Sequence, residues 1–450
     1  MNTADPLELW GGIECTLNRV GDGYYDQLAR NGHYRRGGDL ERFAALGLRT
    51  LRYPLLWERA VTATPGEFDF TFADERLAEL RRLGITPIAG LLHHGSGPRD
   101  VDMRRPEFSQ KLAEYAAAVA ARFPWLDCYT PVNEPLTTAR FCGLYGLWYP
   151  HSRSDRDFVR MLLEECRGTV LAMRAIRQVN PRAQLVQTDD LGQVSSTPAL
   201  RAQAEFENHR RWLAWDLLCG RVAPEHPLYE YLVRSGASPA ELDWLRDNPC
   251  PPAIIGIDHY VTSDRFLDER LDRYPRWSWG GNGRQNYADV DAVRVLARPG
   301  TSLRPIIVEA ARRYGLPVAL TEVHIGCTVD EQCRWLLEAW QIAQQERARG
   351  VDIRAVTTWA LLGSYDWNTL LTSGSGHYEP GAFDTRDPEA RPTELAALVR
   401  VLAHGALPSS PTGPGWWRRP ERLIYGAGIS GGFDETNRTR TRTRTSRALG

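Results

Sequence analysis

Two glutamates stand out because each follows a short apolar run that is typical of the end of a buried strand. Glu134 closes the stretch Thr-Pro-Val-Asn-Glu, and Glu322 closes Ala-Leu-Thr-Glu. Breaking a glycosidic bond requires one carboxylic acid that protonates the leaving oxygen and one carboxylate on the other side of the anomeric carbon. Two glutamates held face to face would supply both groups. For either glutamate alone, the competing interpretation is an ion pair with an arginine at the strand end.

The scaffold predicted around these glutamates is an α/β fold, a (β/α)8 TIM barrel with long loops on its C-terminal face. Several short runs are apolar or β-branched without alternation, as in strands buried on both faces, and amphipathic helical stretches separate them. Eight such strands indicate the barrel, in which Glu134 ends the fourth strand and Glu322 the seventh, on opposite sides of the mouth. The candidate strands are residues 9–13, 48–53, 86–92, 127–132, 184–188, 253–257, 317–320 and 353–359.

Long insertions after three of these strands are candidate walls of a substrate pocket. They cover residues 19–36, 136–156 and the tryptophan-rich stretch 262–293. Loops that follow barrel strands gather on the C-terminal face, where active sites of this fold are built. A surface cover without any ligand role is the alternative for each loop.

The amino-acid composition limits the kinds of molecule that the protein is expected to bind. The 450 residues carry 55 basic and 56 acidic side chains, a net charge of -1, and Lys111 is the only lysine. This balance argues against nucleic acid, and the absence of a run of about 18 apolar residues argues against a membrane span. The start of the chain lacks the features of a signal peptide, and the eight cysteines form no Cys-x-x-Cys pair, so we expect a reduced cytoplasmic protein. Neither a metal nor a cofactor is predicted, because no metal-ligand spacing is found.

The domain organisation predicted from composition has three parts. Residues 1–405 would form the catalytic barrel, and residues 406–435 a C-terminal extension packed on it. Residues 436–450 alternate threonine and arginine and contain few apolar side chains, so we expect them to be disordered.

The order of several motifs resembles that of family 1 of the glycoside hydrolases, the retaining β-glucosidase and β-galactosidase family. Asn133-Glu134-Pro135 and Thr321-Glu322 match its catalytic pattern, and the similarity runs from residue 9 to residue 384. No single motif is decisive, but all of them occur in the family's order. The others are Leu-Trp-Gly at 9–11, Leu-Arg-Tyr-Pro-Leu-Leu-Trp at 51–57, Leu-Leu-His-His at 91–94, Ile-Asp-His-Tyr at 257–260 and Trp-Ala-Leu-Leu-Gly-Ser-Tyr-Asp-Trp at 359–367.

The resemblance implies a role for each matched residue. Glu134 would be the general acid and then the general base, and Glu322 the nucleophile that forms a glycosyl-enzyme ester. Arg52 and Tyr260 would keep Glu322 ionised and aligned, and Asn133 would bind the sugar 2-hydroxyl. The remaining hydroxyls and the ring face would be held by His93, Trp359, Asp366 and Trp367.

The departures from the family's pattern cluster in this sugar subsite. Asn18 stands where the family has a glutamine, with Glu14 added nearby, and Asp366 stands where it has a glutamate. Each shortening withdraws a polar head by one methylene and can leave a sugar hydroxyl out of hydrogen-bond reach. His94 replaces the family's tryptophan and Asp258 its asparagine. We therefore predict a glycone other than simple glucose, such as a deoxy, galacto-configured or furanose sugar.

The function predicted is that of a retaining glycoside hydrolase acting on a small carbohydrate or glycoside through a covalent ester. A transglycosidase with the same mechanism is one alternative, since it differs only in the acceptor. The other alternative is a catalytically silent carbohydrate-binding barrel, against which the joint presence of Glu134, Glu322, Arg52 and Tyr260 argues. The oligomeric state is left open.

Overall fold

The computed structural model describes residues 6–298, 300–406 and 413–425, and the chain divides into two compact units. The larger unit comprises Met1–Leu191, His209–Tyr260 and Leu303–Gly413, and the smaller unit Gly192–Asn208, Val261–Ser302 and Pro414–Gly450. The predicted residues of the catalytic pair and of the sugar subsite all belong to the larger unit.

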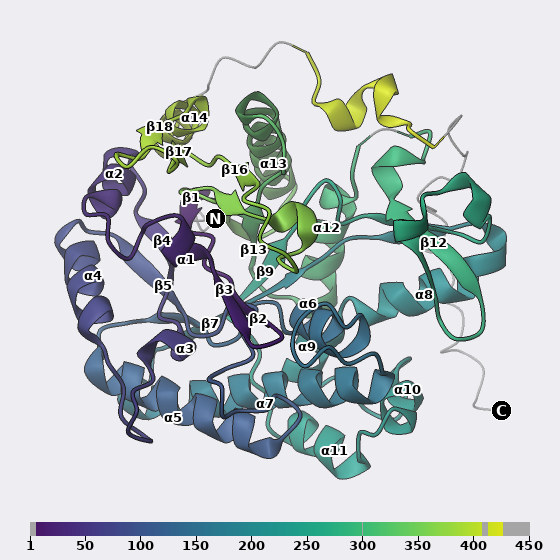
Figure 1. Ribbon diagram of the computed structural model, residues 1–450, viewed down its shortest axis with the longest axis horizontal. Coiled ribbons are helices and arrows are strands. Elements are labelled where there is room, and N and C mark those ends of the chain that lie inside the picture. Colours follow the sequence, from purple (N-terminus) through teal and green to yellow (C-terminus); the bar gives the residue numbers. More distant parts are fainter. Residues whose placement is uncertain (1–5, 299, 407–412, 426–450) are drawn as a thin grey trace. The chain divides into compact units, whose positions relative to one another are not determined.

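Eight parallel strands close into a barrel in the larger unit, and each overlaps one of the strands predicted from the sequence. The predicted (β/α)8 barrel is confirmed (Figure 1). Neighbouring strands follow one another in chain order around the ring, which is the arrangement that right-handed βαβ units produce. The strands are β1 (Glu8–Gly12), β4 (Thr50–Pro54), β5 (Thr86–Gly90), β6 (Cys128–Thr130), β7 (Gln184–Asp190), β9 (Ile254–Asp258), β13 (Val318–Val323) and β14 (Ile353–Thr358).

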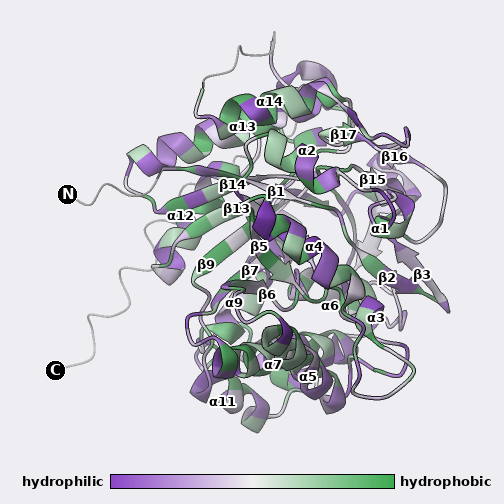
Figure 2. Cartoon of the chain, turned by 90° about the vertical axis from the view of Figure 1, so that its left-hand side faces the viewer, coloured by the Kyte–Doolittle hydropathy of each residue, from purple (hydrophilic) through white to green (hydrophobic). Residues whose placement is uncertain are grey.

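Large and small side chains alternate in the packed interior of the barrel. Trp10 of β1 fills the space that Ala319 of β13 and Ala355 of β14 leave, and Ile88 and Val186 complete this cluster. A barrel of this type is therefore a filled core and its reactive groups must stand at the rim. The apolar colour of strands such as β9 in Figure 2 reflects this burial on both faces.

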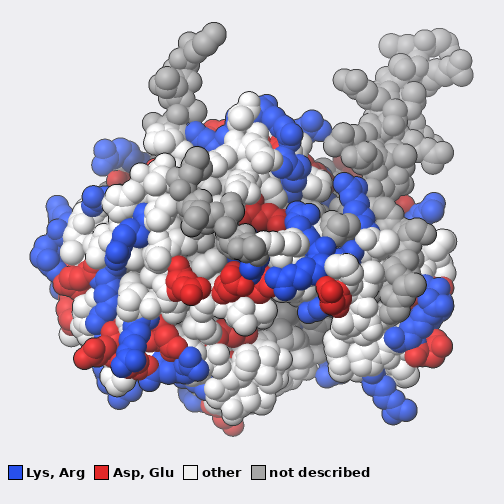
Figure 3. Space-filling model, turned by 90° about the horizontal axis from the view of Figure 1, so that it is seen from above, with Lys and Arg blue, Asp and Glu red and all other residues white. Residues whose placement is uncertain are grey.

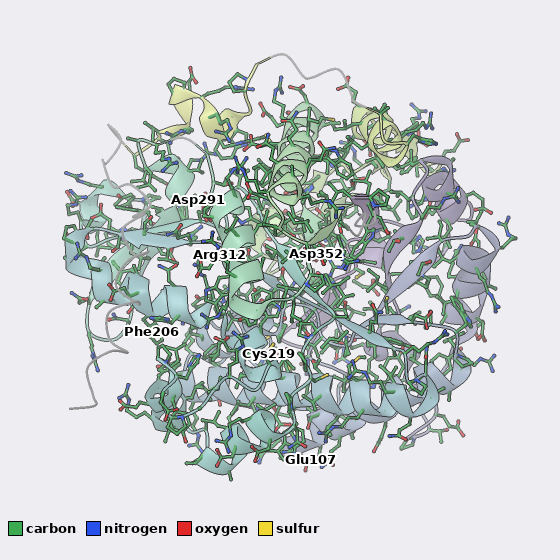
Figure 4. The ribbon with its side chains drawn as sticks, turned by 180° about the vertical axis from the view of Figure 1, so that it is seen from behind. Glu107, Phe206, Cys219, Asp291, Arg312 and Asp352 are labelled. Carbon is green, nitrogen blue, oxygen red and sulfur yellow. The ribbon has the colours of Figure 1, made fainter. Side chains whose placement is uncertain are left out.

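Helices surround the barrel and turn polar side chains outward. Glu107 on α5 and Arg312 on α12 are both exposed, whereas Phe108 and Ile307 beside them are buried (Figure 4). Thr328 accepts a hydrogen bond from the backbone N–H of Glu331 and so caps the start of α13. The helices of this unit are α1 (Gln27–Arg30), α2 (Asp39–Ala45), α3 (Trp57–Ala60), α4 (Thr71–Arg82), α5 (Pro106–Arg122), α6 (Pro135–Ala139), α7 (Asp155–Val179), α9 (Leu213–Leu218), α10 (Tyr229–Arg234), α11 (Pro239–Asp247), α12 (Leu303–Tyr314), α13 (Val329–Ala348) and α14 (Glu394–Ala403). Two short hairpin strands of the rim, β2 (Leu17–Val20) and β3 (Gly23–Asp26), follow β1.

The smaller unit contains its own sheet, with strands in the order β11 (Trp279–Gly281), β12 (Asn286–Asp291), β10 (Arg265–Asp268) and β8 (Val194–Ser196). The tryptophan-rich stretch 262–293 thus forms most of a small sheet. Arg422 donates hydrogen bonds of 2.7 Å to the carbonyls of Val293, Leu296 and Ala297, which attaches residues 414–425 to this sheet's own core. The helix α8 (Arg201–Arg210) begins in the same unit. The predicted Thr/Arg tail and the end of the predicted extension, residues 426–450, lie outside the described residues.

The surface carries both signs of charge. On the face drawn in Figure 3, basic and acidic side chains are interspersed, and Lys111 on α5 pairs with Asp100 at 2.7 Å. All eight cysteines are free thiols. None of the helices in the described parts of the chain is long and apolar enough to cross a membrane.

Candidate active site

Glu322 stands at the C-terminal end of β13, where the pairing register with β9 shifts between Leu320 and Glu322. Such an irregularity re-aims a side chain at the end of a strand. Arg52 of β4 donates from Nη1 to Glu322 Oε1 at 2.8 Å and to the Thr321 carbonyl at 2.7 Å, and Tyr260 donates its hydroxyl hydrogen to Glu322 Oε2. Both oxygens of this buried carboxylate therefore have a donor.

Glu134 follows β6 and is the N-cap residue of α6, in the left-handed region with φ 46°. That conformation is strained for a residue with a Cβ and turns the side chain away from the path of the strand. The helix behind it is fixed by Asp189 of β7, whose carboxylate accepts from the backbone N–H groups of Leu136 at 3.0 Å and Thr137 at 3.3 Å. His94 Nε2 lies 3.6 Å from Glu134 Oε2.

The two glutamates meet a third carboxyl, that of Asp258 at the end of β9. One carboxyl oxygen of each of these three buried residues lies within 4.8 Å of the others. Burial raises the pKa of Glu134 well above its usual value, and the charges of Asp258 and Glu322 raise it further. Burial and Asp258 also raise the pKa of Glu322, whereas Arg52 and Tyr260 act in the opposite direction.

The arrangement has two chemical capabilities. A carboxyl that keeps its proton to high pH, facing a carboxylate held by a cation and a hydroxyl, can act as an acid and nucleophile pair. Three converging carboxyl oxygens are also the type of ligand set that holds a hard cation. The sequence predicts no metal, and that stays a prediction.

Asn133 has its amide orientation fixed by two donors. Its Oδ1 accepts from Arg52 Nη2 at 2.5 Å and from Thr188 Oγ1 at 2.7 Å. The Nδ2 group is therefore directed elsewhere and lies 3.3 Å from His93 Nε2. An amide held in this way presents an N–H donor at the barrel mouth, beside both glutamates.

An aromatic wall surrounds the carboxyls. The rings of His93 and Trp359 stack at 5.6 Å with an angle of 10° between them, and the ring of His94 contacts those of Trp148 and Trp367. Burial, assisted by the nearby Arg52 charge, lowers the pKa of His94 to about 3, and burial lowers that of His93 well below its usual value. Both imidazoles are therefore neutral at pH 7 and can donate or accept hydrogen bonds.

Glu14 connects this wall to the strand β1. Its Oε2 accepts from the indole N–H groups of Trp367 at 3.0 Å and Trp359 at 3.3 Å, and its Oε1 accepts from the backbone of Thr16 at 2.8 Å. Burial raises the pKa of Glu14, and these three donors oppose that shift. The structure thus brings Glu14 together with both tryptophans that the sequence places in the sugar subsite.

Asp366 has its carboxylate engaged within the protein, whereas Asn18 has only its amide nitrogen engaged, since its buried Oδ1 has no hydrogen-bond partner. Asn18 donates from Nδ2 to the Leu371 carbonyl at 3.3 Å. The Asp366 carboxylate pairs with Arg30 and accepts from Ser375 Oγ at 2.8 Å and from the backbone of His377 at 2.9 Å. A sugar-binding role for either residue stays a prediction, and for Asp366 any such contact would compete with an ion pair.

Four residues that sequence reasoning did not single out complete the site. Thr188 and Thr321 orient Asn133 and Asp258, and Asp189 holds the helix that carries Glu134. Thr188, Thr321 and Asp189 each lie on a barrel strand beside a predicted site residue. Their position near the strand ends was therefore the signal in the sequence that could have identified them. Trp148 lies in the predicted pocket-wall segment 136–156, but the stretch gave no reason to choose it over its neighbours.

No protein-family model matches the chain. The chain is 24% identical to thermostable beta-glucosidase B of Thermobispora bispora over 393 residues, which cover 81% of this chain and 79% of that protein. It is 20% identical to beta-glucosidase 47 of Arabidopsis thaliana over 444 residues, covering 89% and 81%.

Among solved structures, the family 1 β-glucosidase from Thermotoga maritima superposes with a TM-score of 0.71 at 16% identity, covering 90% of this chain and 100% of that chain. The same enzyme in complex with deoxynojirimycin gives the same values. Along most of its length the chain is similar in sequence to these β-glucosidases, and its barrel is similar to that of the family 1 enzyme.

Proposed function

We propose that this protein is a retaining glycosidase that removes a terminal β-linked sugar by double displacement. The observation that carries the proposal is the pair of buried carboxyls, Glu134 and Glu322, whose oxygens approach within 4.8 Å. Retaining enzymes separate these groups by about 5–5.5 Å, and inverting enzymes need about 6.5–9.5 Å to admit a water molecule.

In the first step, Glu322 attacks the anomeric carbon and forms an ester, while Glu134 gives its proton to the leaving oxygen. Arg52 and Tyr260 hold the Glu322 carboxylate in line before the attack. In the second step, Glu134 takes a proton from water, and the resulting hydroxide attacks the anomeric carbon and releases Glu322. Two inversions at one carbon restore the starting configuration.

Recognition of the sugar rests on groups whose orientation is already fixed. The Asn133 amide would donate to the 2-hydroxyl, and His93 and Glu14 would bind hydroxyls farther round the ring. Trp359 and Trp367 supply apolar faces, which suit the C–H face of a pyranose. We propose that the glycone is not simply glucose, because His94 and Asp258 stand beside Glu134 where the family's motif has other residue types.

A panel of activated 2-fluoro glycosides, followed by mass spectrometry, tests the mechanism and the glycone together. We expect one sugar configuration to label Glu322, and the Glu322→Gln variant to remain unlabelled. The Glu165→Gln variant changes a buried carboxyl of α7 outside the site and serves as the matched control that still labels. Product analysis with an added hydroxyl acceptor separates hydrolysis from transglycosylation.

Labelling of a residue other than Glu322 would overturn the mechanistic assignment. Equal turnover of an aryl β-glucoside and every other aryl glycoside tested would overturn the specificity assignment alone. The complete absence of labelling and turnover across the panel would favour a silent carbohydrate-binding barrel. A cytoplasmic location and independence of nucleic acid stay predictions.

A further inference from the structure

Asp258 occupies the space between the two catalytic glutamates and is fully buried. In the barrel register it stands opposite Glu322 of β13 on one side and Asp190 of β7 on the other. Its Oδ1 accepts from Thr321 Oγ1 at 2.6 Å and lies 3.9 Å from Arg52 Nη1. This oxygen is therefore held by a hydroxyl and lies near a cation.

The second carboxyl oxygen of Asp258, Oδ2, has no hydrogen-bond donor while Glu134, Asp258 and Glu322 are all ionised. Oδ2 is buried and receives no hydrogen bond from a hydroxyl, amide or guanidinium group. The group that faces Asp258 is the Glu134 carboxyl, one oxygen of which lies within 4.8 Å of an Asp258 oxygen. Two ionised carboxylates cannot hydrogen-bond to each other, since neither has a hydrogen, and a buried charge without a donor is costly.

We propose that Asp258 is a positioning residue for Glu134. The two carboxyls share one proton, and this proton stays on Glu134 because Asp258 is the ionised partner. The inference rests on the proposed glycosidase function and adds a residue to its machinery. Shared protons between close carboxyls are an established way of keeping one acid protonated near neutral pH. Here the pair consists of the general acid after β6 and a residue at the end of β9, which only β7 separates from β6.

The surroundings decide which carboxyl holds the proton. Burial raises the pKa of both carboxyls, but Arg52 and Thr321 act against this shift at Asp258 and favour its ionised form. Glu134 has no cation of its own, because His94 at 3.6 Å is neutral at pH 7. The remaining facing groups are carboxylates, Glu322 and the half-buried Asp190, and they disfavour a charge on Glu134.

The pairing also balances charge through the reaction. Before the attack, Glu322 and Asp258 each carry one negative charge, Arg52 carries one positive charge, and Glu134 is neutral. When Glu322 becomes an ester, Glu134 has given up its proton and carries the charge instead, so the net charge of the group stays constant. The new Glu134 carboxylate then lies beside ionised Asp258, which makes Glu134 a stronger base toward water in the second step.

The pH profile of kcat/KM in the Asp258→Asn variant tests the proposal. A general acid acts only while it is protonated, so activity is lost as the pH rises through its pKa. By raising the pKa of Glu134, Asp258 extends the alkaline limb of the pH profile to higher pH. We expect Asp258→Asn to move that limb to lower pH by about one unit or more, since the isosteric amide removes the charge. The loss of rate above the new limb should be large for aryl glycosides with poor leaving groups and small for activated ones, because only the former need the proton.

Asp190→Asn is the matched control, since it removes one carboxylate from the neighbouring strand at the position opposite Asp258. We expect a smaller shift in this variant. An equal shift would mean that general negative charge at the rim acts on Glu134 and no proton is shared. An unchanged alkaline limb in Asp258→Asn would also overturn the proposal.

Infrared spectroscopy measures the shared proton without any turnover. The difference spectrum between wild-type protein and Glu134→Gln at neutral pH should show the C=O band of the protonated Glu134 carboxyl, and in Asp258→Asn this contribution should titrate away at lower pH. This result in a protein that cleaves no glycoside would support the proton pair and reject the glycosidase function. The absence of this difference band, or an activity that EDTA abolishes and Ca²⁺ restores, would show that the three carboxyls are held by other means.

Discussion

The carboxyl oxygens of Glu134 and Glu322 approach within 4.8 Å across the mouth of the barrel. This spacing is closer to the separation of about 5–5.5 Å in retaining enzymes than to the roughly 6.5–9.5 Å that an inverting enzyme needs to admit a water. We therefore expect the first product of an aryl β-glycoside to be the β-anomer, observed by NMR before mutarotation. Initial release of the α-anomer would show that Glu322 acts as a base.

Glu14 is expected to govern sugar binding through its contacts with Trp359 and Trp367. Glu14→Gln keeps an acceptor for the indoles but loses the charge that strengthens a hydrogen bond to a sugar hydroxyl. Hydrogen bonds to charged groups contribute about 1.5–3 kcal/mol, so kcat/KM should fall roughly 10- to 150-fold. The measurement is steady-state kinetics on the preferred aryl glycoside. A change of less than about twofold would place the sugar away from Glu14.

Asp366 is expected to stabilise the folded state more than it binds sugar. Its pKa is raised by burial but lowered overall by Arg30, Ser375 and the His377 backbone. A lowered pKa stabilises the folded state above the unfolded pKa of about 3.9, and the contribution is lost as the pH falls through the folded value. Asp366→Asn should therefore cost about 1.5–3 kcal/mol at pH 7.

The midpoint of urea unfolding checks this expectation. The difference between wild-type and Asp366→Asn protein should be largest near neutral pH and should narrow below about pH 4. The kcat/KM of the variant should fall less than that of Glu14→Gln. A larger loss of kcat/KM with unchanged stability would return Asp366 to the sugar subsite.

Arg52 is expected to set the acidic limb of the pH profile. Glu322 must be ionised to attack, so activity rises with pH through its pKa, which Arg52 lowers. Arg52→Gln removes the cation and should move the acidic limb to higher pH by about one unit or more. Arg52→Lys keeps the charge but not the two-pronged contact with Glu322 and Asn133, so a smaller shift is expected. Identical acidic limbs in all three proteins would contradict this role.

The barrel was predictable because its strands are buried on both faces and leave continuous apolar runs in the sequence. The same runs located Glu134 and Glu322, since a charged residue directly after such a strand lies at the rim. The sheet of the smaller unit was not predicted. Its strands are short, and they come from segments as far apart as β8 and β12, so no local pattern indicates their pairing.

The direction of the side chains at the barrel rim was the other feature that the sequence could not predict. The sequence placed Asp366 in the sugar subsite, but its carboxylate pairs with Arg30, more than three hundred residues earlier. Asp258 was placed there as well, and the approach of its carboxyl to that of Glu134 depends on how β6, β7 and β9 lie side by side in the barrel. Such pairings are fixed by three-dimensional packing and have no counterpart in residue spacing.

The contact of Asp189 with α6 has a consequence for the electric field at Glu134. The first backbone N–H groups of a helix carry a partial positive charge that stabilises a nearby anion by about 0.3–1 kcal/mol. In this protein Asp189 receives the hydrogens of Leu136 and Thr137, and the Glu134 side chain caps none of them. The helix dipole is therefore directed at a residue that takes no part in bond cleavage, and Glu134 gains little of the stabilisation that would release its proton.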